Sequence, residues 1–88
     1  MTQLATSQFN ATTQTTVVFG RELTASENAA IQDSKSATIS AGHQVSPKIV
    51  VDNTTQINLW SDLADAEAYV AVCGGFTPAP LSVSVTAV

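Results

Sequence analysis

Alternation of apolar and polar residues marks strands near the two ends of the chain. Residues 13–19 are rich in Thr and Val and stop at Gly20, which is typical of a strand that runs into a turn. From residue 81 to the C-terminus, aliphatic residues at odd positions alternate with Ser and Thr. Side chains two residues apart share one face of a strand. This last strand is therefore expected to turn its odd positions toward the core: Leu81, Val83, Val85 and Ala87.

Two further β-rich runs lie in the middle of the chain, at residues 48–52 and 56–60. Asn53-Thr54-Thr55 separates them, which predicts a hairpin. In the second run Ile57 and Leu59 form an aliphatic face, and the other face carries two amides and the indole of Trp60. We expect the polar positions of these strands to face outward: Gln56, Asn58, Ser82, Ser84 and Thr86.

Two helices separate these strands. Thr24-Ala25-Ser26-Glu27 has the spacing of a capping box, so a helix is predicted from Ala25 to about Ser36. Residues 36–40 fit an extended conformation equally well. The apolar positions of this helix form only a thin stripe, which consists of Ala25, Ala29, Ala30, Ile31 and Ala37.

The second predicted helix has the stronger pattern. Ser61 or Asp62 caps it, and further carboxylates follow in its first two turns, where the helix dipole favours negative charge. Gly74-Gly75 is expected to end it. The residues predicted to face the core recur at helical spacing: Leu63, Ala66, Val70 and Cys73.

The order of elements is β-α-β-β-α-β. This order predicts a small single α+β domain over residues 13–88, with a ferredoxin-like antiparallel sheet of four strands and two helices on one face. Residues 1–12 are polar apart from Leu4 and Phe9, and we interpret them as an N-terminal arm.

Charge is scarce along the chain. Charged residues make up 11% of it, whereas Ser and Thr supply 21 of the 88 residues. A surface covered by hydroxyls, amides and alanine suits burial against other subunits. The net charge is −4, and the only bases are Arg21, Lys35 and Lys48. Nucleic acid and anionic membrane are therefore not expected partners, because both require clustered cations.

Neither a transmembrane run nor a signal peptide is evident in the sequence. We therefore expect the chain to be made and used in the cytosol, or to be packaged into a particle there.

Few residues could carry chemistry. Cys73 lies on an apolar helix stripe, so we interpret it as a buried structural thiol, and His43 lies in a turn without a second histidine. Asp62 and Asp65 share a helix face, where they complement the dipole or, as the alternative, bind a cation. We predict no catalytic residues, no cofactor and no metal, and hence a protein that is not an enzyme.

The large apolar residues are the candidates for protein–protein contacts. Each aromatic side chain has a core role as its default. Trp60 is the exception of interest, because it falls on the polar face of its strand, where an exposed indole would mark a contact surface. The interface candidates are Leu4, Phe9, Trp60, Tyr69 and Phe76.

The C-terminal third contains a recognisable series of elements. A strand that ends in Trp60-Ser61-Asp62 leads into a short acidic helix with Ala66-Glu67-Ala68-Tyr69-Val70. The connector Phe76-Thr77-Pro78-Ala79-Pro80 and a final strand follow. This series resembles small proteins of tailed bacteriophages, particularly marine ones. Arg21-Glu22-Leu23-Thr24 with Glu27 is a second similar element, whereas Cys73-Gly74-Gly75 departs from the pattern.

The resemblance implies a phage origin. Combined with the low charge, it leads us to expect a non-enzymatic structural or assembly component of a phage particle. Its expected partners are copies of itself, as a homo-oligomer, or other phage structural proteins. Its expected location is the virion, and the host cytoplasm during assembly. The alternative is a small phage-encoded binding module that inhibits or sequesters a host factor through its acidic half.

Overall fold

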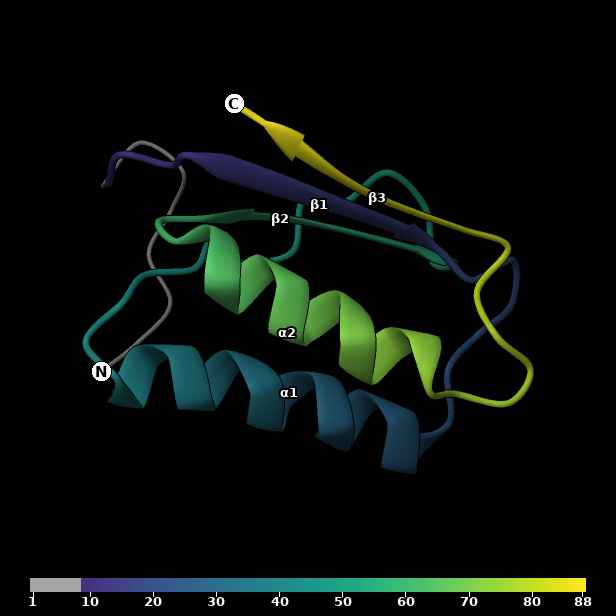
Figure 1. The fold of residues 1–88 in the computed structure, drawn as a ribbon. Coiled ribbons are helices and arrows are strands. Elements are labelled where there is room, and N and C mark those ends of the chain that lie inside the picture. Colours follow the sequence, from purple (N-terminus) through teal and green to yellow (C-terminus); the bar gives the residue numbers. More distant parts are fainter. Residues whose placement is uncertain (1–8) are drawn as a thin grey trace.

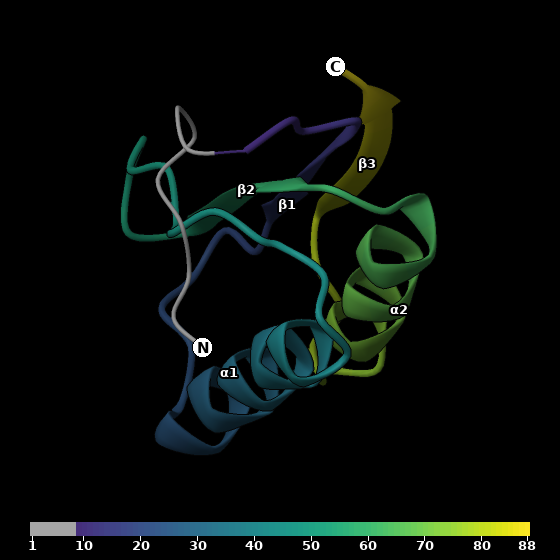
Figure 2. The ribbon, with the colours of Figure 1, turned by 90° about the vertical axis from the view of Figure 1, so that its left-hand side faces the viewer.

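The computed structural model describes residues 9–88, which form an α+β domain. Two helices cover one face of a three-stranded antiparallel sheet, and no helix of the described residues lies on the opposite face (Figures 1 and 2). The strand order is β2-β1-β3. In chain order the elements are β1 (Thr13–Val18), α1 (Ala25–Ser40), β2 (Thr55–Trp60), α2 (Leu63–Gly74) and β3 (Ser82–Ala87).

The central strand, β1, pairs antiparallel with both neighbours. The side chains at its odd positions, Thr13, Thr15 and Val17, are buried and therefore lie on the face of the sheet that is turned toward the core. Thr12 already belongs to this sheet, because its N–H donates to the carbonyl of Trp60 and its carbonyl accepts from the Val88 N–H. The expected arm therefore ends before residue 12, and residues 1–8 of it lie outside the described part.

The predicted fourth strand is wrong. Residues 48–52 form no strand, and only two isolated bridges, Val45 to Trp60 and Ile49 to Ile57, join the preceding segment to β2. Pro47 lies between these bridges and has no N–H to donate. The Leu59 N–H instead donates to the hydroxyl of Ser46, at 2.8 Å. Irregular chain thus runs along β2 where the ferredoxin-like pattern requires a regular strand.

The expected faces of β2 are also wrong. Trp60 and Asn58 are fully buried, whereas Ile57 and Leu59 lie half-buried on the outer face. The register explains the difference, since Trp60 lies opposite Thr13 on the core side of β1. The indole N–H donates to the Thr15 hydroxyl at 2.9 Å, which makes the burial of this polar group favourable.

The last strand, β3, turns its expected face toward the core, but the side chains on that face are only partly buried. Its odd positions lie opposite the core positions of β1, and Val85 packs against the core. Val83 is nevertheless 43% exposed and Leu81 is 75% exposed. Ser82, Ser84 and Thr86 lie on the outer face, as expected. The exposure of the odd positions follows from the place of β3 at the edge of the sheet.

The helices begin as predicted. Thr24 and Glu27 form the reciprocal capping box of α1, and Asp62 caps α2. α1 extends to Ser40, so residues 36–40 are helical. Its buried residues are Ile31, Lys35 and Thr38 rather than the alanines, and those of α2 are Ala66, Tyr69 and Cys73.

The predicted stripe of α2 is confirmed at Ala66 and Cys73, which are buried, and Val70 packs against the core. Tyr69 was not part of that stripe, but it is buried as well. The Tyr69 ring lies 5.0 Å from the Trp60 ring, centroid to centroid, which turns this face of α2 toward the sheet. Leu63 is left 52% exposed. Gly75 ends α2 with φ of −83°, so the left-handed cap that glycine permits is not used here.

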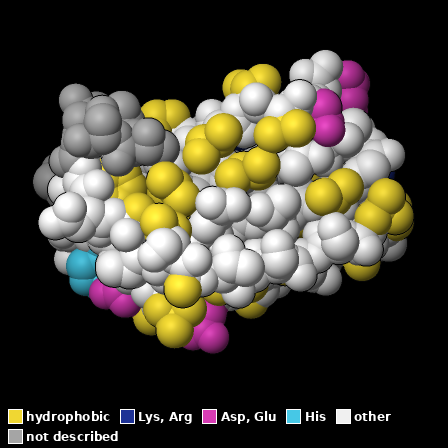
Figure 3. Space-filling view, turned by 90° about the horizontal axis from the view of Figure 1, so that it is seen from above, with side chains coloured by type: hydrophobic (Ala, Val, Ile, Leu, Met, Phe, Trp, Pro, Cys, Tyr) yellow, Lys and Arg dark blue, Asp and Glu magenta, His cyan; other side chains and the backbone are white. Residues whose placement is uncertain are grey.

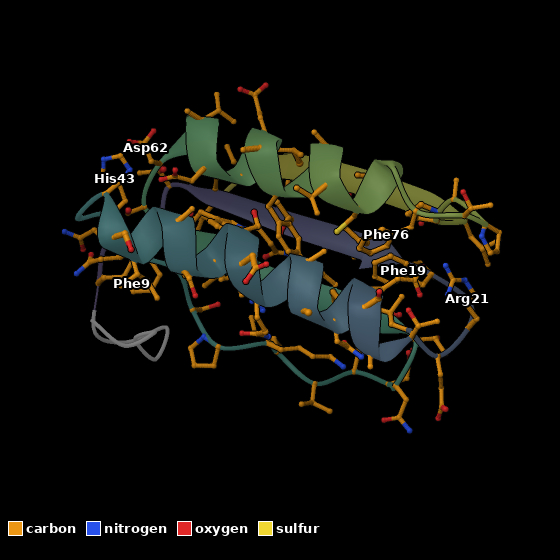
Figure 4. All side chains as sticks on the ribbon, turned by 90° about the horizontal axis from the view of Figure 1, so that it is seen from below. Phe9, Phe19, Arg21, His43, Asp62 and Phe76 are labelled. Atoms are coloured by element: carbon orange, nitrogen blue, oxygen red, sulfur yellow. The ribbon has the colours of Figure 1, made fainter. Side chains whose placement is uncertain are left out.

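Arg21 links the start of α1 to the connector before β3. Both terminal nitrogens of Arg21 donate to the Glu27 carboxylate at 2.8 Å, and one also donates to the Pro78 carbonyl at 3.0 Å. The Phe19 and Phe76 rings, whose centroids are 6.0 Å apart, lie toward the same end of the molecule as Arg21 (Figure 4). The hydrogen bonds from Arg21, together with that from the Thr24 N–H, lower the pKa of Glu27 to about 2.

We predict that Glu27→Gln lowers stability most at neutral pH. The carboxylate stabilises the fold fully above its unfolded pKa of about 4.5, and this contribution disappears as the pH falls toward 2. The difference in melting temperature between wild type and variant should therefore be largest above about pH 5 and vanish near pH 2. Glu22→Gln is the matched control, since its carboxylate accepts no hydrogen bond within residues 9–88. A constant difference across this pH range would contradict the assignment.

Candidate functional site

The outer edge of β3 is the most unusual surface of the molecule. The Val88 N–H donates to the Thr12 carbonyl, so the even residues of this strand direct their backbone groups toward β1. The backbone N–H and carbonyl groups of Val83, Val85 and Ala87 therefore point to the open edge. Within the described chain, no strand pairs with them. An unpaired row of this kind is a template for another strand.

The sequence of β3 does nothing to block such pairing. Natural edge strands are commonly protected by Lys, Pro or a bulge. No charged residue follows Glu67 in the chain, and β3 contains no proline. Its register with β1 continues without interruption from Ser82 to Ala87. The edge is thus free of the usual obstacles.

Apolar side chains accompany this edge. Leu81, Val83 and Val88 are 75%, 43% and 68% exposed. The outer side of the sheet, seen in Figure 3, shows separate hydrophobic groups over its middle and acidic side chains only at its margins. A partner strand at β3 would therefore meet no like charge and could cover some of this apolar surface.

The opposite edge of the sheet is covered. Segment 44–49 runs beside β2 and forms backbone hydrogen bonds to it, including those from Ser46 to Leu59 and from Ile49 to Ile57, both at 2.8 Å. The Asn58 side chain adds a bond to the Ser46 carbonyl at 3.0 Å. Only β3 thus offers a long free edge in the described structure.

The predicted interface residues do not form one surface. Leu4 lies outside the described residues. Phe9 is half-buried near the end of the molecule marked by His43 (Figure 4). Trp60 and Tyr69 are fully buried, and Phe76 packs against Phe19 and the core. The aromatic residues thus build the core, and the available surface is aliphatic. The uncharged stretch after Glu67 is the sequence signal that could have pointed to this surface.

The structure brings His43 close to Asp62 and Asp65. The two aspartates lie at the start of α2, whereas His43 lies about 20 residues earlier in the chain. His43 Nδ1 lies 2.7 Å from the Asp65 carboxylate and 3.8 Å from that of Asp62. One donor atom from each residue lies within 4.8 Å of the others, a set that could hold a divalent cation. The hydrogen bond to Asp65 also accounts for this arrangement without an ion, because it fixes the turn before β2 to the start of α2.

A second polar group lies in the core. Lys35 is 2% exposed, and no carboxylate pairs with it among residues 9–88. Its Nζ lies 6.0 Å from the centroid of the Tyr69 ring, a weak cation–π contact. Burial, opposed by the nearby Cys73 thiol, lowers the pKa of Lys35 to about 8. Burial likewise raises the pKa of Cys73 to about 11, so this thiol is protonated and not an activated nucleophile.

We predict that Lys35→Met stabilises the protein at pH 7 by about 1–3 kcal/mol, because a buried unpaired charge is costly. The folded protein releases this proton near pH 8, whereas the unfolded chain holds it to about 10.5. The free energy of unfolding of the wild type therefore rises with pH between about pH 8 and pH 10.5. Urea denaturation should show a smaller advantage for the variant at pH 9.5 than at pH 7. A variant less stable than wild type at pH 7 would show that the ammonium group stabilises the fold.

No protein-family model, curated protein or solved structure matches this chain. Within residues 9–88, neither helix combines the length and apolar character needed to cross a bilayer. The functional assignment therefore depends on the chain's own surface.

Proposed function

We propose that this protein is a non-enzymatic assembly component that acts by adding a strand from another chain to β3. The open, uncharged edge of β3 is the observation that supports the proposal. Strand addition obtains affinity from backbone hydrogen bonds and specificity from alternate side chains. The odd residues of β3 supply both, since they carry the unpaired backbone groups and the apolar side chains.

A second copy of the chain is a suitable occupant of this edge. Two β3 strands related by a two-fold axis at Val85 run antiparallel and place Val85 opposite Val85, and Val83 opposite Ala87. Odd residues then meet odd residues, so the free backbone groups face one another and the apolar side chains stay on one face. The absence of charge after Glu67 avoids like-charge repulsion at the contact, despite the net charge of −4 on each copy.

The phage setting is part of the proposal. The series from Trp60 to Val88 resembles proteins of tailed bacteriophages, and a low-charge subunit with one adhesive edge suits a particle in which neighbours cover it. Strands of other phage structural proteins could occupy the same edge. Detection at stoichiometric copy number in purified particles would support this setting, and co-purification with a single host protein would instead favour an inhibitory module.

We predict that Val83→Lys weakens association without unfolding the protein. The side chain of Val83 is partly exposed beside the free edge, where a lysine opposes strand pairing. Val50→Lys is the matched control, because Val50 is 78% exposed in a loop away from β3. Sedimentation analysis should show concentration-dependent dimers for wild type and Val50→Lys and at least tenfold weaker association for Val83→Lys. A wild type that stays monomeric at high micromolar concentration would exclude self-pairing.

A further inference from the structure

The outer face of the sheet, on the side away from the helices, is a surface that no helix or strand of residues 9–88 covers (Figures 1 and 3). Even positions of β1 and β3 and odd positions of β2 form this face, because the register pairs these positions across the sheet. Ile49 joins them beside Ile57, through an isolated bridge. None of the side chains on this face is charged: Gln14, Thr16, Val18, Ile49, Ile57, Leu59, Ser82, Ser84 and Thr86.

The composition of the outer face suits contact with a second copy of the same face. Hydroxyl groups both donate and accept hydrogen bonds, so a surface rich in Ser and Thr is complementary to an identical one. The aliphatic side chains of Ile57 and Leu59 are only half-buried, and further burial of their surface is favourable. Each copy has a net charge of −4, but the carboxylates in Figure 3 lie at the margins of this face. Two such faces therefore meet without like-charge repulsion at their centre.

The area of the outer face decides which assembly can use it. Three strands and the segment beside β2 lie about 4.8 Å apart and rise by about 3.3 Å per residue, which gives one copy a flat face of about 400 Å². A stable interface buries about 800 Å² on each partner. One copy thus offers about half of the required area. Two copies joined through β3 form a continuous sheet of twice this width, and their combined face reaches the required size.

We propose that pairs of chains joined through β3 stack on one another through their outer faces, and this inference rests on the proposed function. Two twisted sheets pack face to face at a separation of about 10 Å, with their strands nearly aligned. With two-fold symmetry each β2 lies over another β2, so Ile57 and Leu59 meet their counterparts. The hydroxyl groups of Ser84 and Thr86 meet at the centre of the stack, where the β3 strands lie. The helices then form the outside of a closed tetramer in which every outer face is covered.

Thr16→Lys tests the stack, because Thr16 lies half-buried on the central strand and belongs to the outer face. Sedimentation analysis of the wild type should show dimers first and tetramers as the concentration rises. Thr16→Lys should keep the dimers and weaken tetramer formation by about tenfold or more, since each stack would bury an unpaired ammonium group from every copy. Ser36→Lys is the matched control, because Ser36 is exposed on α1, on the opposite side of the sheet, and this variant should assemble like the wild type.

Relaxation of methyl NMR signals by a soluble gadolinium chelate is a second measurement, which needs no variant. The methyl groups of Val18, Ile57 and Leu59 should be accessible to the chelate in dilute wild-type protein and shielded from it in the tetramer. Shielding that is already complete in dilute protein would overturn the proposal, because the chain itself would then cover the face.

The outcomes distinguish the stack from the pairing of β3. A wild type that stops at dimers would overturn the stack and leave β3 pairing intact. Tetramers that form equally well from a folded Thr16→Lys variant would have the same consequence. A wild type that stays monomeric at high micromolar concentration would overturn both, because the outer face of one copy is too small to hold a stack alone.

Discussion

The burial of Trp60 is the constraint on which the rest of the structure depends. Its indole N–H needs a partner, and the Thr15 hydroxyl on the neighbouring strand provides one. That bond and the register with β1 determine which face of β2 is turned toward the core. The Trp60 ring in turn packs against the Tyr69 ring of α2. Because Asp62 caps α2 only two residues later, the position of the tryptophan also sets where the helix crosses the sheet.

Features encoded by neighbouring residues could be predicted from the sequence. The Thr24–Glu27 capping box, the Asp62 cap and the alternation in β3 each involve residues within a few positions of one another, and the structure contains all three. The inward face of β2 could not be predicted in this way. The Asn58 side-chain nitrogen and the Trp60 indole N–H donate to Ser46 and Thr15, 12 and 45 residues away, so a polar pattern was interpreted as a solvent-facing one.

The candidate sites show the same division. The lack of charge after Glu67 was visible in the sequence, but its meaning depends on β3 lying at an edge, which is a property of strand order. His43 contacts Asp65, which lies 22 residues later in the chain, and local spacing does not predict such a contact. Lys35, placed on a helix of otherwise small residues, gave no sign that it would be buried.

The irregular segment that covers β2 determines what kind of assembly the protein can form. A sheet with two free edges can recruit copies at both sides and grow without limit into a fibril. Here the segment with Ser46 and Pro47 lies along the β2 edge, so within residues 9–88 a chain that joined another through β3 would have no second free edge strand. In the proposed assembly through β3, growth would therefore end after a single addition, and the covered edge of β2 would keep this β-rich chain from open-ended polymerisation.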